Sequence, residues 1–290
     1  MIALFVHSLV KHKYLGMGIV GAIIILSTKA AILGLEHPLT SIGFLPYPSY
    51  TNMNGFSGIT KLFNHLGLYW VAIGGMLCLV SLKLWQRGLL SSLKVQLGKL
   101  TYNWTKIQGA AFIILAITSI SAASVVYYNT NIVSNYETIA DNLDSRENYE
   151  RQFKQYESLD RLYPVVMKTE VDIFPSESMF RIKANYVVKH KGVNPISQVF
   201  ITERVPLLNI AFEQGTLVAH DSIYGTYLFE FEIPIQPQQT LNYSFETKKT
   251  LKGYETNRAI VNSGTYINFR DFEPFNYAKH FEITNAIERE

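Results

Sequence analysis

The chain has 290 residues, enough for two or three separately folded units, and 48% of them are hydrophobic. Its net charge of +3 hides a division, because residues 1–130 carry nine basic residues and one acidic residue, whereas residues 131–290 carry a net charge of −5. This division is typical of a membrane protein with an outer domain and argues against nucleic-acid binding. The single cysteine, Cys78, excludes an internal disulfide.

Three apolar segments lie in the first half of the chain, over residues 15–35, 66–84 and 107–127. A helix that crosses a hydrocarbon core of about 30 Å needs about 20 apolar residues, and each segment meets this requirement. Trp85 and Trp104 lie near segment ends, where amphipathic rings favour the membrane interface. We therefore predict a membrane domain with three spanning helices over residues 1–130.

Basic residues predict the orientation of these spans. The connection between the second and third spans carries five basic residues and no acidic one, namely Lys83, Arg87, Lys94, Lys99 and Lys106. Residues 37–65 carry only Lys61. By the positive-inside rule, residues 85–106 and the N-terminus are cytoplasmic, and everything after residue 130 lies outside.

Lys29 lies inside the first expected span. It could line a path for an ion or a substrate, which is the usual meaning of a charge in a span. The interpretation that we favour is simpler: the long side chain reaches back to the outer interface.

Residues 131–163 are predicted to form a helical stalk. Ser134 and Glu137 have the spacing of a capping box at the start of a helix. Tyr149, Phe153 and Tyr156 form a narrow apolar stripe at helical spacing. The stripe is either a seam that docks onto the outer domain, which we favour, or a ligand site.

From Pro164 the period of the sequence changes to two. Apolar and polar residues alternate over residues 167–173, 180–188, 227–233 and 241–246, and turn-forming residues follow each run. Short alternating runs of this kind predict about eight strands in an all-β antiparallel sandwich or saddle, each sheet with one buried face. We assign residues 164–275 to this domain and residues 276–290 to a tail.

Recognisable catalytic motifs are missing from the sequence. None of the seven histidines belongs to a helical zinc-protease motif, and neither a phosphate-binding loop nor a nucleophile elbow occurs. The sequence therefore predicts no catalytic residue, no metal ligand and no cofactor on this chain.

Five short stretches carry a resemblance to a known family: residues 35–39 (LEHPL), 50–55 (YTNMNG), 149–157 (YERQFKQYE), 171–175 (VDIFP) and 262–268 (NSGTYIN). In this order and spacing they resemble bacterial membrane proteins that join an ABC-type permease-like helical region to an aminopeptidase N-type gluzincin metallopeptidase. The resemblance covers most of the chain. It implies a bacterial cytoplasmic (inner) membrane location with an extracytoplasmic C-terminal domain.

The resemblance also implies that the strand-rich region is the N-terminal saddle domain of such a peptidase. In the family, the zinc helix and its substrate loop lie downstream, so zinc would bind beyond Glu290 and this chain would be a fragment or a split product. The end of the saddle domain helps to hold the free amino terminus of the substrate. The nearest positions here are Gly264, Thr265 and Asn268, although a turn and edge strand of small polar residues would look the same.

Three functions follow from these observations. The first is a membrane-anchored, non-catalytic portion of an aminopeptidase-like metallopeptidase, whose saddle domain shapes a peptide-binding cleft. The second is a stalked extracytoplasmic β-sandwich that serves as a binding or structural module. The third, a permease subunit, is the weakest because the spans offer little beyond Lys29 to line a path. The expected partners are the lipid bilayer, a catalytic peptidase domain or subunit, and a peptide, but no nucleic acid.

Overall fold

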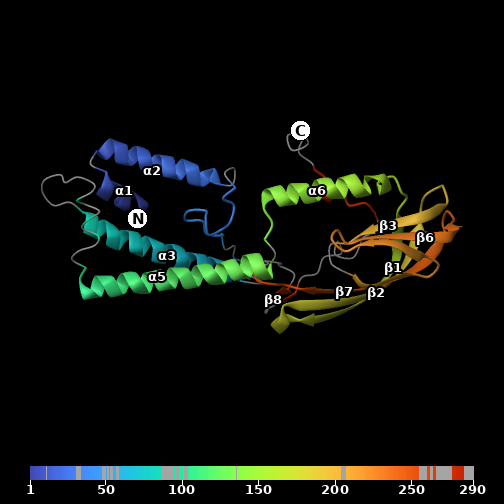
Figure 1. The fold of residues 1–290 in the computed structure, drawn as a ribbon. Helices are drawn as coiled ribbons and strands as arrows, with labels where there is room; N and C mark the ends of the chain where they lie inside the picture. The colour runs from blue at the N-terminus through green and yellow to red at the C-terminus, as the bar shows by residue number, and fades with distance from the viewer. Residues whose placement is uncertain are drawn as a thin grey trace. The chain divides into compact units, whose positions relative to one another are not determined.

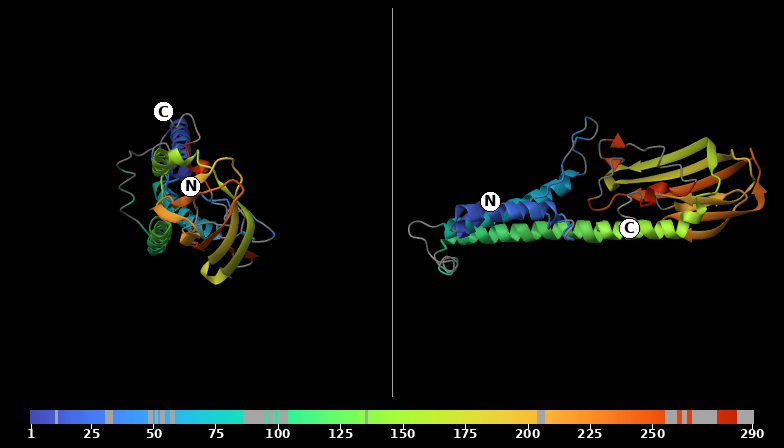
Figure 2. Two further views of the ribbon diagram at one scale, coloured as in Figure 1. Left: turned by 90° about the vertical axis from the view of Figure 1, so that its right-hand side faces the viewer. Right: turned by 90° about the horizontal axis from the view of Figure 1, so that it is seen from above.

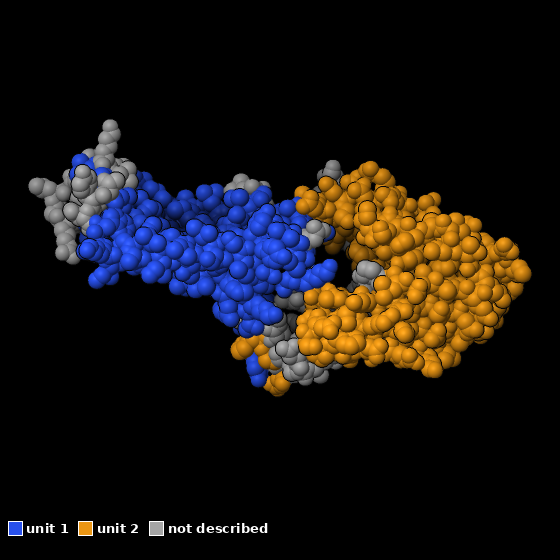
Figure 3. Space-filling view, turned by 60° about the horizontal axis from the view of Figure 1, so that its bottom comes forward, with its two compact units in different colours: residues 1–50, 58–138, 252–255 blue, residues 51–57, 139–251, 256–290 orange. Residues whose placement is uncertain are grey.

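The computed structural model describes residues 1–10, 12–30, 34–47, 50, 52, 55–56, 59–85, 95, 98, 100, 104–134, 136–203, 207–254, 260–261, 264–265 and 276–283. The chain forms two compact units, which Figure 3 colours separately. The first contains residues 1–50, 58–138 and 252–255, and the second contains residues 51–57, 139–251 and 256–290. The first unit is helical, and the second is built mainly from strands.

The first unit consists of the helices α1 (Ile2–Leu9), α2 (Lys13–Thr28), α3 (Ile59–Leu84) and α5 (Lys106–Tyr127), with α5 continued by the π-helical segment η2 (Tyr128–Val133) (Figure 1). Helix α3 packs along α5, and α1 packs on α2 and α3. Gly75 permits a close approach of the two long helices, because a Cβ atom there would lie 3.0 Å from Cδ1 of Leu115.

Among the described residues, two helices are long and apolar enough to cross a membrane: Ile59–Leu84, with 26 residues, and Lys106–Val133, with 28. At a rise of 1.5 Å per residue they measure roughly 39 to 42 Å, more than the hydrocarbon core requires. Helix α2 has 16 residues and measures about 24 Å. Within the first expected span, α2 ends at Thr28 and Lys29 takes the C-cap position, and residues 31–33 lie outside the described residues.

The capping box of this unit lies at Thr105 and Gln108, at the start of α5. The Thr105 hydroxyl accepts from the Gln108 backbone N–H at 3.2 Å, and Gln108 Oε1 accepts from the Thr105 N–H at 3.5 Å. The box expected at residues 134–137 is wrong. Ser134 ends η2 and donates its hydroxyl to the Asn129 carbonyl at 2.8 Å, so it satisfies the end of one helix rather than the start of the next.

The second unit begins with α6 (Ile139–Phe153) and the short turn η3 (Lys154–Tyr156). The strands are β1 (Leu162–Phe174), β2 (Met179–His190), β3 (Ile196–Thr202), β4 (Leu207–Phe212), β5 (Thr216–Asp221), β6 (Thr226–Ile235), β7 (Thr240–Thr250), β8 (Ile260–Val261) and β9 (Gly264–Thr265), with 3-10 turns η4 (Pro175–Glu177) and η6 (Lys279–Phe281). They form sheets in the orders β1-β2-β7-β4, β3-β6-β5 and β8-β9. Every described strand pair is antiparallel, as the alternation predicts (Figure 2).

The core of this unit is one cluster of apolar side chains from the four-stranded and the three-stranded sheet. Tyr186 on β2 and Phe229 on β6 are each 1% exposed, and both lie in the alternating runs for which one buried face is predicted. Other members of the cluster are Phe180, Ile182, Ala184, Val188, Val199, Ile201, Phe212, Phe231, Leu241, Tyr243 and Phe245. No disulfide contributes, so burial of these side chains supplies the stabilisation.

Strand β1 departs from the expected burial. Its alternation predicts a buried face, yet Met167, Val171 and Ile173 are 43%, 37% and 42% exposed, and only Leu162 at its start is buried. Because β1 is the edge strand of the wider sheet, the three-stranded sheet leaves most of its inner face uncovered. Ile233 on β6 is also exposed, in a stretch where the pairing of β3 with β6 shifts register.

The stripe on α6 is a docking seam, as predicted. Tyr149 is fully buried, its Oη lies 3.1 Å from Thr202 Oγ1 on β3, and it accepts the Ala278 backbone N–H at 3.0 Å. Phe153 and Tyr156 pack in the same cluster, with Phe200, Tyr224, Leu228, Tyr277 and Phe281. Instead of standing free as a stalk, α6 joins residues 276–283 to the three-stranded sheet.

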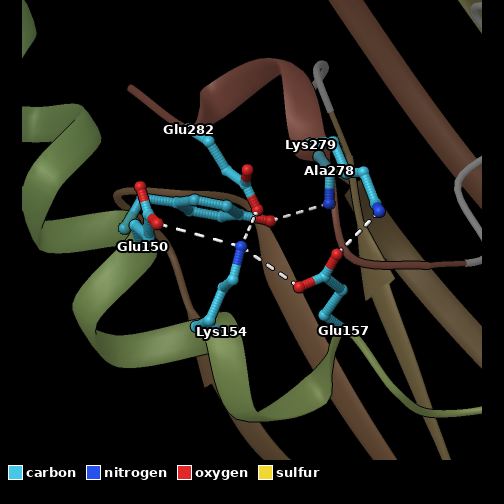
Figure 4. A network of polar contacts seen from close by, with 7 residues as sticks. Glu150, Lys154, Glu157, Ala278, Lys279 and Glu282 are labelled. Atoms are coloured by element: carbon cyan, nitrogen blue, oxygen red, sulfur yellow. Dashed lines mark hydrogen bonds and ion pairs between the residues drawn. The ribbon is translucent and has the colours of Figure 1, made fainter. Parts of the chain in front are cut away.

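Charged residues of α6, η3, η6 and their neighbours form an ion-pair network at this seam (Figure 4). Lys154 Nζ lies 2.5 Å from Glu282, 3.1 Å from Glu157 and 3.8 Å from Glu150, and Lys279 binds Glu157 at 2.7 Å. Because the network is partly exposed to solvent, it contributes less to the stability of the fold than the buried aromatic rings of the seam do.

Candidate functional site: a polar groove across four strands

The four-stranded sheet carries a groove on its solvent side, away from the core. The groove has a volume of about 420 Å³ and is lined by residues of all four strands and the loop after β4. Side chains on one face of a sheet form rows, because directly paired residues of neighbouring strands point the same way. The pairing register therefore defines which side chains line the groove.

The first row crosses the whole sheet. Lys168 on β1 pairs with Asn185 on β2, Asn185 pairs with Ser244 on β7, and Ser244 pairs with Ala211 on β4. An amide and a hydroxyl thus lie side by side in the middle of the groove, with an ammonium group at the β1 end. Asn and Ser side chains can both donate and accept hydrogen bonds.

The second row lies two residues along the strands. Val166 pairs with Val187, and Val187 pairs with Asn242. Beyond β4, the Glu213 backbone N–H donates to the Asn242 carbonyl at 3.1 Å, and Asn242 Nδ2 donates to Glu213 Oε2 at 2.8 Å. The Asn242 amide therefore fixes the position of the Glu213 carboxylate at the end of the groove.

The two ends of the groove carry opposite charges. Neither Lys168 nor Glu213 forms an ion pair with another described side chain. Three strand spacings separate β1 from β4, so the backbones at the two ends lie roughly 14 Å apart. A ligand that carries a positive group could therefore bind at Glu213 and extend over the amide and hydroxyl groups.

Buried aromatic rings form the floor beneath the rows. The rings of Tyr186 and Tyr243 lie 6.3 Å apart, and Tyr243 packs on Phe212 with ring centroids 4.6 Å apart. Burial, with a smaller effect of the Glu203 charge, raises the pKa of Tyr243 well above its ordinary value. The phenol therefore stays neutral, and the floor is a rigid support that offers no base.

The groove is lined by few ionisable groups. It holds one carboxylate and no histidine or cysteine. Across the part of the chain that the structure describes, no three His, Cys, Asp or Glu side chains come together in a way that could hold a metal ion. The groups that line the groove can form hydrogen bonds and ion pairs.

The site residues expected from the resemblance lie elsewhere. Gly264 and Thr265 form β9, which pairs with β8 in a separate two-stranded sheet, and Asn268 lies outside the described residues. The groove residues escaped the sequence analysis because polar residues at alternate positions look like any solvated strand face. Only the strand order brings β1 and β4 to the two sides of one surface.

Comparison with known proteins adds no assignment. No family model matches this chain, and no curated protein matches it.

Proposed function

We propose that this chain is a membrane-anchored, non-catalytic module that binds peptides outside the cytoplasmic membrane. The observation that carries the binding part is the polar row Lys168–Asn185–Ser244, which lies beside the hydrogen-bonded pair of Asn242 and Glu213. The anchoring part is supported by the two apolar helices of spanning length.

Burial supports the membrane interpretation of these helices. Only 17% of the apolar window of each is buried within the protein, whereas the core helix of a soluble protein would be mostly buried. The proposal adds a third span over residues 15–35, which overlaps α2 from residue 15 to Thr28, and places the basic residues 83–106 on the cytoplasmic side. The N-terminus would then be cytoplasmic. The second, strand-rich unit, here called the β-unit, would be extracytoplasmic.

A peptide fits the groove better than other ligand classes. The rows offer amide and hydroxyl groups that match the donors and acceptors of a peptide backbone, and Glu213 matches a free amino terminus. A span of roughly 14 Å corresponds to about four extended residues. Lys168 is the one cation among the residues that line the groove, which is too few for a polyphosphate.

The family resemblance extends this proposal. In that extension, the β-unit is the saddle domain of an aminopeptidase-like metallopeptidase, and it shapes the peptide-binding cleft of a zinc-containing catalytic region. A stalked module that binds peptides without such a region is the alternative. Both make the same prediction for the groove, and they differ in whether an added catalytic domain binds the β-unit.

Binding of a short peptide tests the groove. The full chain in nanodiscs would be titrated into a tetrapeptide of alanine and serine with a fluorophore at its C-terminus, and anisotropy would report binding. We expect the free-amine peptide to bind, and both N-terminal acetylation and Glu213→Gln to weaken it roughly tenfold or more. Glu232→Gln, an exposed carboxylate on β6, is the matched control. Equal affinity for the acetylated peptide, or no loss with Glu213→Gln, would refute the proposal.

Reporter fusions test the topology. A reporter fused after residue 95 should give a cytoplasmic signal and one fused after residue 160 an extracytoplasmic signal. Two reporters on the same side of the membrane would refute the proposed orientation.

A further inference from the structure

Strand β1 is an edge strand of the four-stranded sheet and exposes apolar side chains along most of its length. Its partner β2 covers one edge, and no described strand pairs with the other. Val166 is 56% exposed, and Met167, Val171 and Ile173 are also exposed. A long exposed edge with apolar side chains is a template for pairing with another strand.

We propose that β1 pairs antiparallel with β1 of a second copy of this chain, about a two-fold axis at Thr169. The pairing joins two four-stranded sheets into one continuous sheet of eight strands. Such a contact is isologous, because the same strand supplies both sides.

The charges of β1 select this register. With Thr169 opposite Thr169 of the second copy, Lys168 lies opposite Glu170 of the second copy on both sides of the axis. A shift that centres the axis on Glu170 places two glutamates opposite each other, and one centred on Lys168 places two lysines opposite each other. Because directly opposed like charges destabilise a sheet and opposite charges stabilise it, the register at Thr169 is the favourable one.

The pairing of β1 with β2 inside each copy also favours the register at Thr169. Glu170 already lies opposite Lys183 of β2, so in the dimer each Glu170 carboxylate would lie between two ammonium groups. The Lys168 ammonium, which lies opposite a neutral Asn185 within its own sheet, gains a carboxylate.

The inner face of β1 gains apolar contacts in the same register. Met167 lies opposite Val171 of the second copy, so the exposed apolar side chains cover one another across the axis. Pro164, which has no N–H, and Pro175, which begins η4, bound the strand on either side of this stretch. The pairing therefore has defined ends.

A charge exchange tests the register. The mass of the full chain in detergent would be measured by light scattering with the detergent contribution subtracted, over a range of protein concentrations. We expect a dimer for the natural sequence and a dissociation constant roughly tenfold higher or more for Lys168→Glu or Glu170→Lys alone. The double variant with both changes restores opposite charges across the axis and should dimerise more tightly than either single variant, although residue 170 then lies opposite Lys183 of its own sheet. Glu232→Lys, on β6, is the control and should leave the dimer unchanged.

Cross-linking gives a second, geometric test. In a Cys78→Ser background, Thr169→Cys places two cysteines at the axis, where antiparallel neighbours lie about 4.5–5.5 Å apart at Cα and a disulfide can form. Val171→Cys places each cysteine four residues along the strand from the cysteine of the second copy. The two lie roughly 14 Å apart and should not cross-link. A mixture of Met167→Cys and Val171→Cys chains should cross-link.

Three outcomes would overturn the proposal. They are a monomer at all concentrations, a double charge variant no better than the single ones, and equal cross-linking of Thr169→Cys and Val171→Cys. None of these measurements depends on peptide binding at Glu213, so the dimer and the proposed function can fail separately.

Discussion

Strands β1 and β2 are neighbours in one sheet and carry the same kind of alternating sequence, yet they differ in burial. On β2, Phe180, Ile182, Ala184 and Tyr186 are each at most 2% exposed. On β1, their direct partners Ile173, Val171, Thr169 and Met167 remain exposed or half-buried. The two strands therefore share a face of the sheet and differ only in what covers it.

The difference teaches that alternation reports the direction of side chains rather than their burial. A strand acquires a buried face only where another layer reaches it, and the three-stranded sheet reaches β2, β7 and the start of β1. An edge strand left uncovered is available to a partner, which connects this comparison with the proposed dimer.

The largest effect is expected at the centre of the covered region. Phe229→Ala should lower the free energy of unfolding by about 3–5 kcal/mol, because the ring is fully buried and its removal leaves a cavity. Urea unfolding of the full chain in detergent, followed by circular dichroism of the strands, measures the change. A loss below about 1 kcal/mol would show that the core collapses around the cavity or is packed differently.

A matched pair of truncations tests directly whether β1 and β2 differ in burial. Ile182 and Val171 lie opposite each other, one on β2 and one on β1. Ile182→Ala should cost about 2–5 kcal/mol and Val171→Ala less than about 1 kcal/mol in the monomeric protein, since only the first side chain is fully buried. Unfolding of both variants under dissociating conditions gives the two values. Equal losses would mean that β1 is covered after all.

The docking seam of α6 should respond less strongly. Tyr149→Phe keeps the ring and removes the hydroxyl, which leaves the Ala278 N–H and the Thr202 hydroxyl with one partner fewer. The expected loss is about 1–3 kcal/mol, the usual cost of a buried polar group left unsatisfied. Faster amide hydrogen exchange at residues 276–283, without change in β2, would localise the effect to the seam.

The smallest effect is expected from the exposed ion-pair network. Hydrogen bonds from Lys279 and Lys154 lower the pKa of Glu157 below its ordinary value of 4.5. A lowered pKa in the folded state stabilises the fold above the ordinary pKa, and this contribution is lost as the pH falls through the folded value. The urea midpoint of the natural chain should therefore fall slightly more than that of Glu157→Gln as the pH is lowered below about 4.5. Identical pH profiles would show that solvent screens the network completely.

The sequence by itself predicts the local structure well. The strands β1, β2, β6 and β7 cover the predicted alternating runs, and each of them ends shortly after its run. The inward positions of Tyr186 and Phe229 follow from the alternation, and the stripe on α6 follows from helical spacing. These features depend on neighbours within a few residues, so periodicity and turn chemistry are sufficient. The misplaced capping box shows the limit, because Ser134 could serve either end of a helix.

Only the tertiary structure determined which strands and side chains that are distant in sequence lie next to each other. The order β1-β2-β7-β4 brings Lys168 on β1 and Glu213 in the loop after β4 to the two sides of one groove, although they are far apart in sequence. The same order leaves β1 at an edge that the second sheet does not cover. Both results depend on which strands pair and how wide each sheet becomes, and these are determined by the sum of contacts over the whole β-unit rather than by any local stretch.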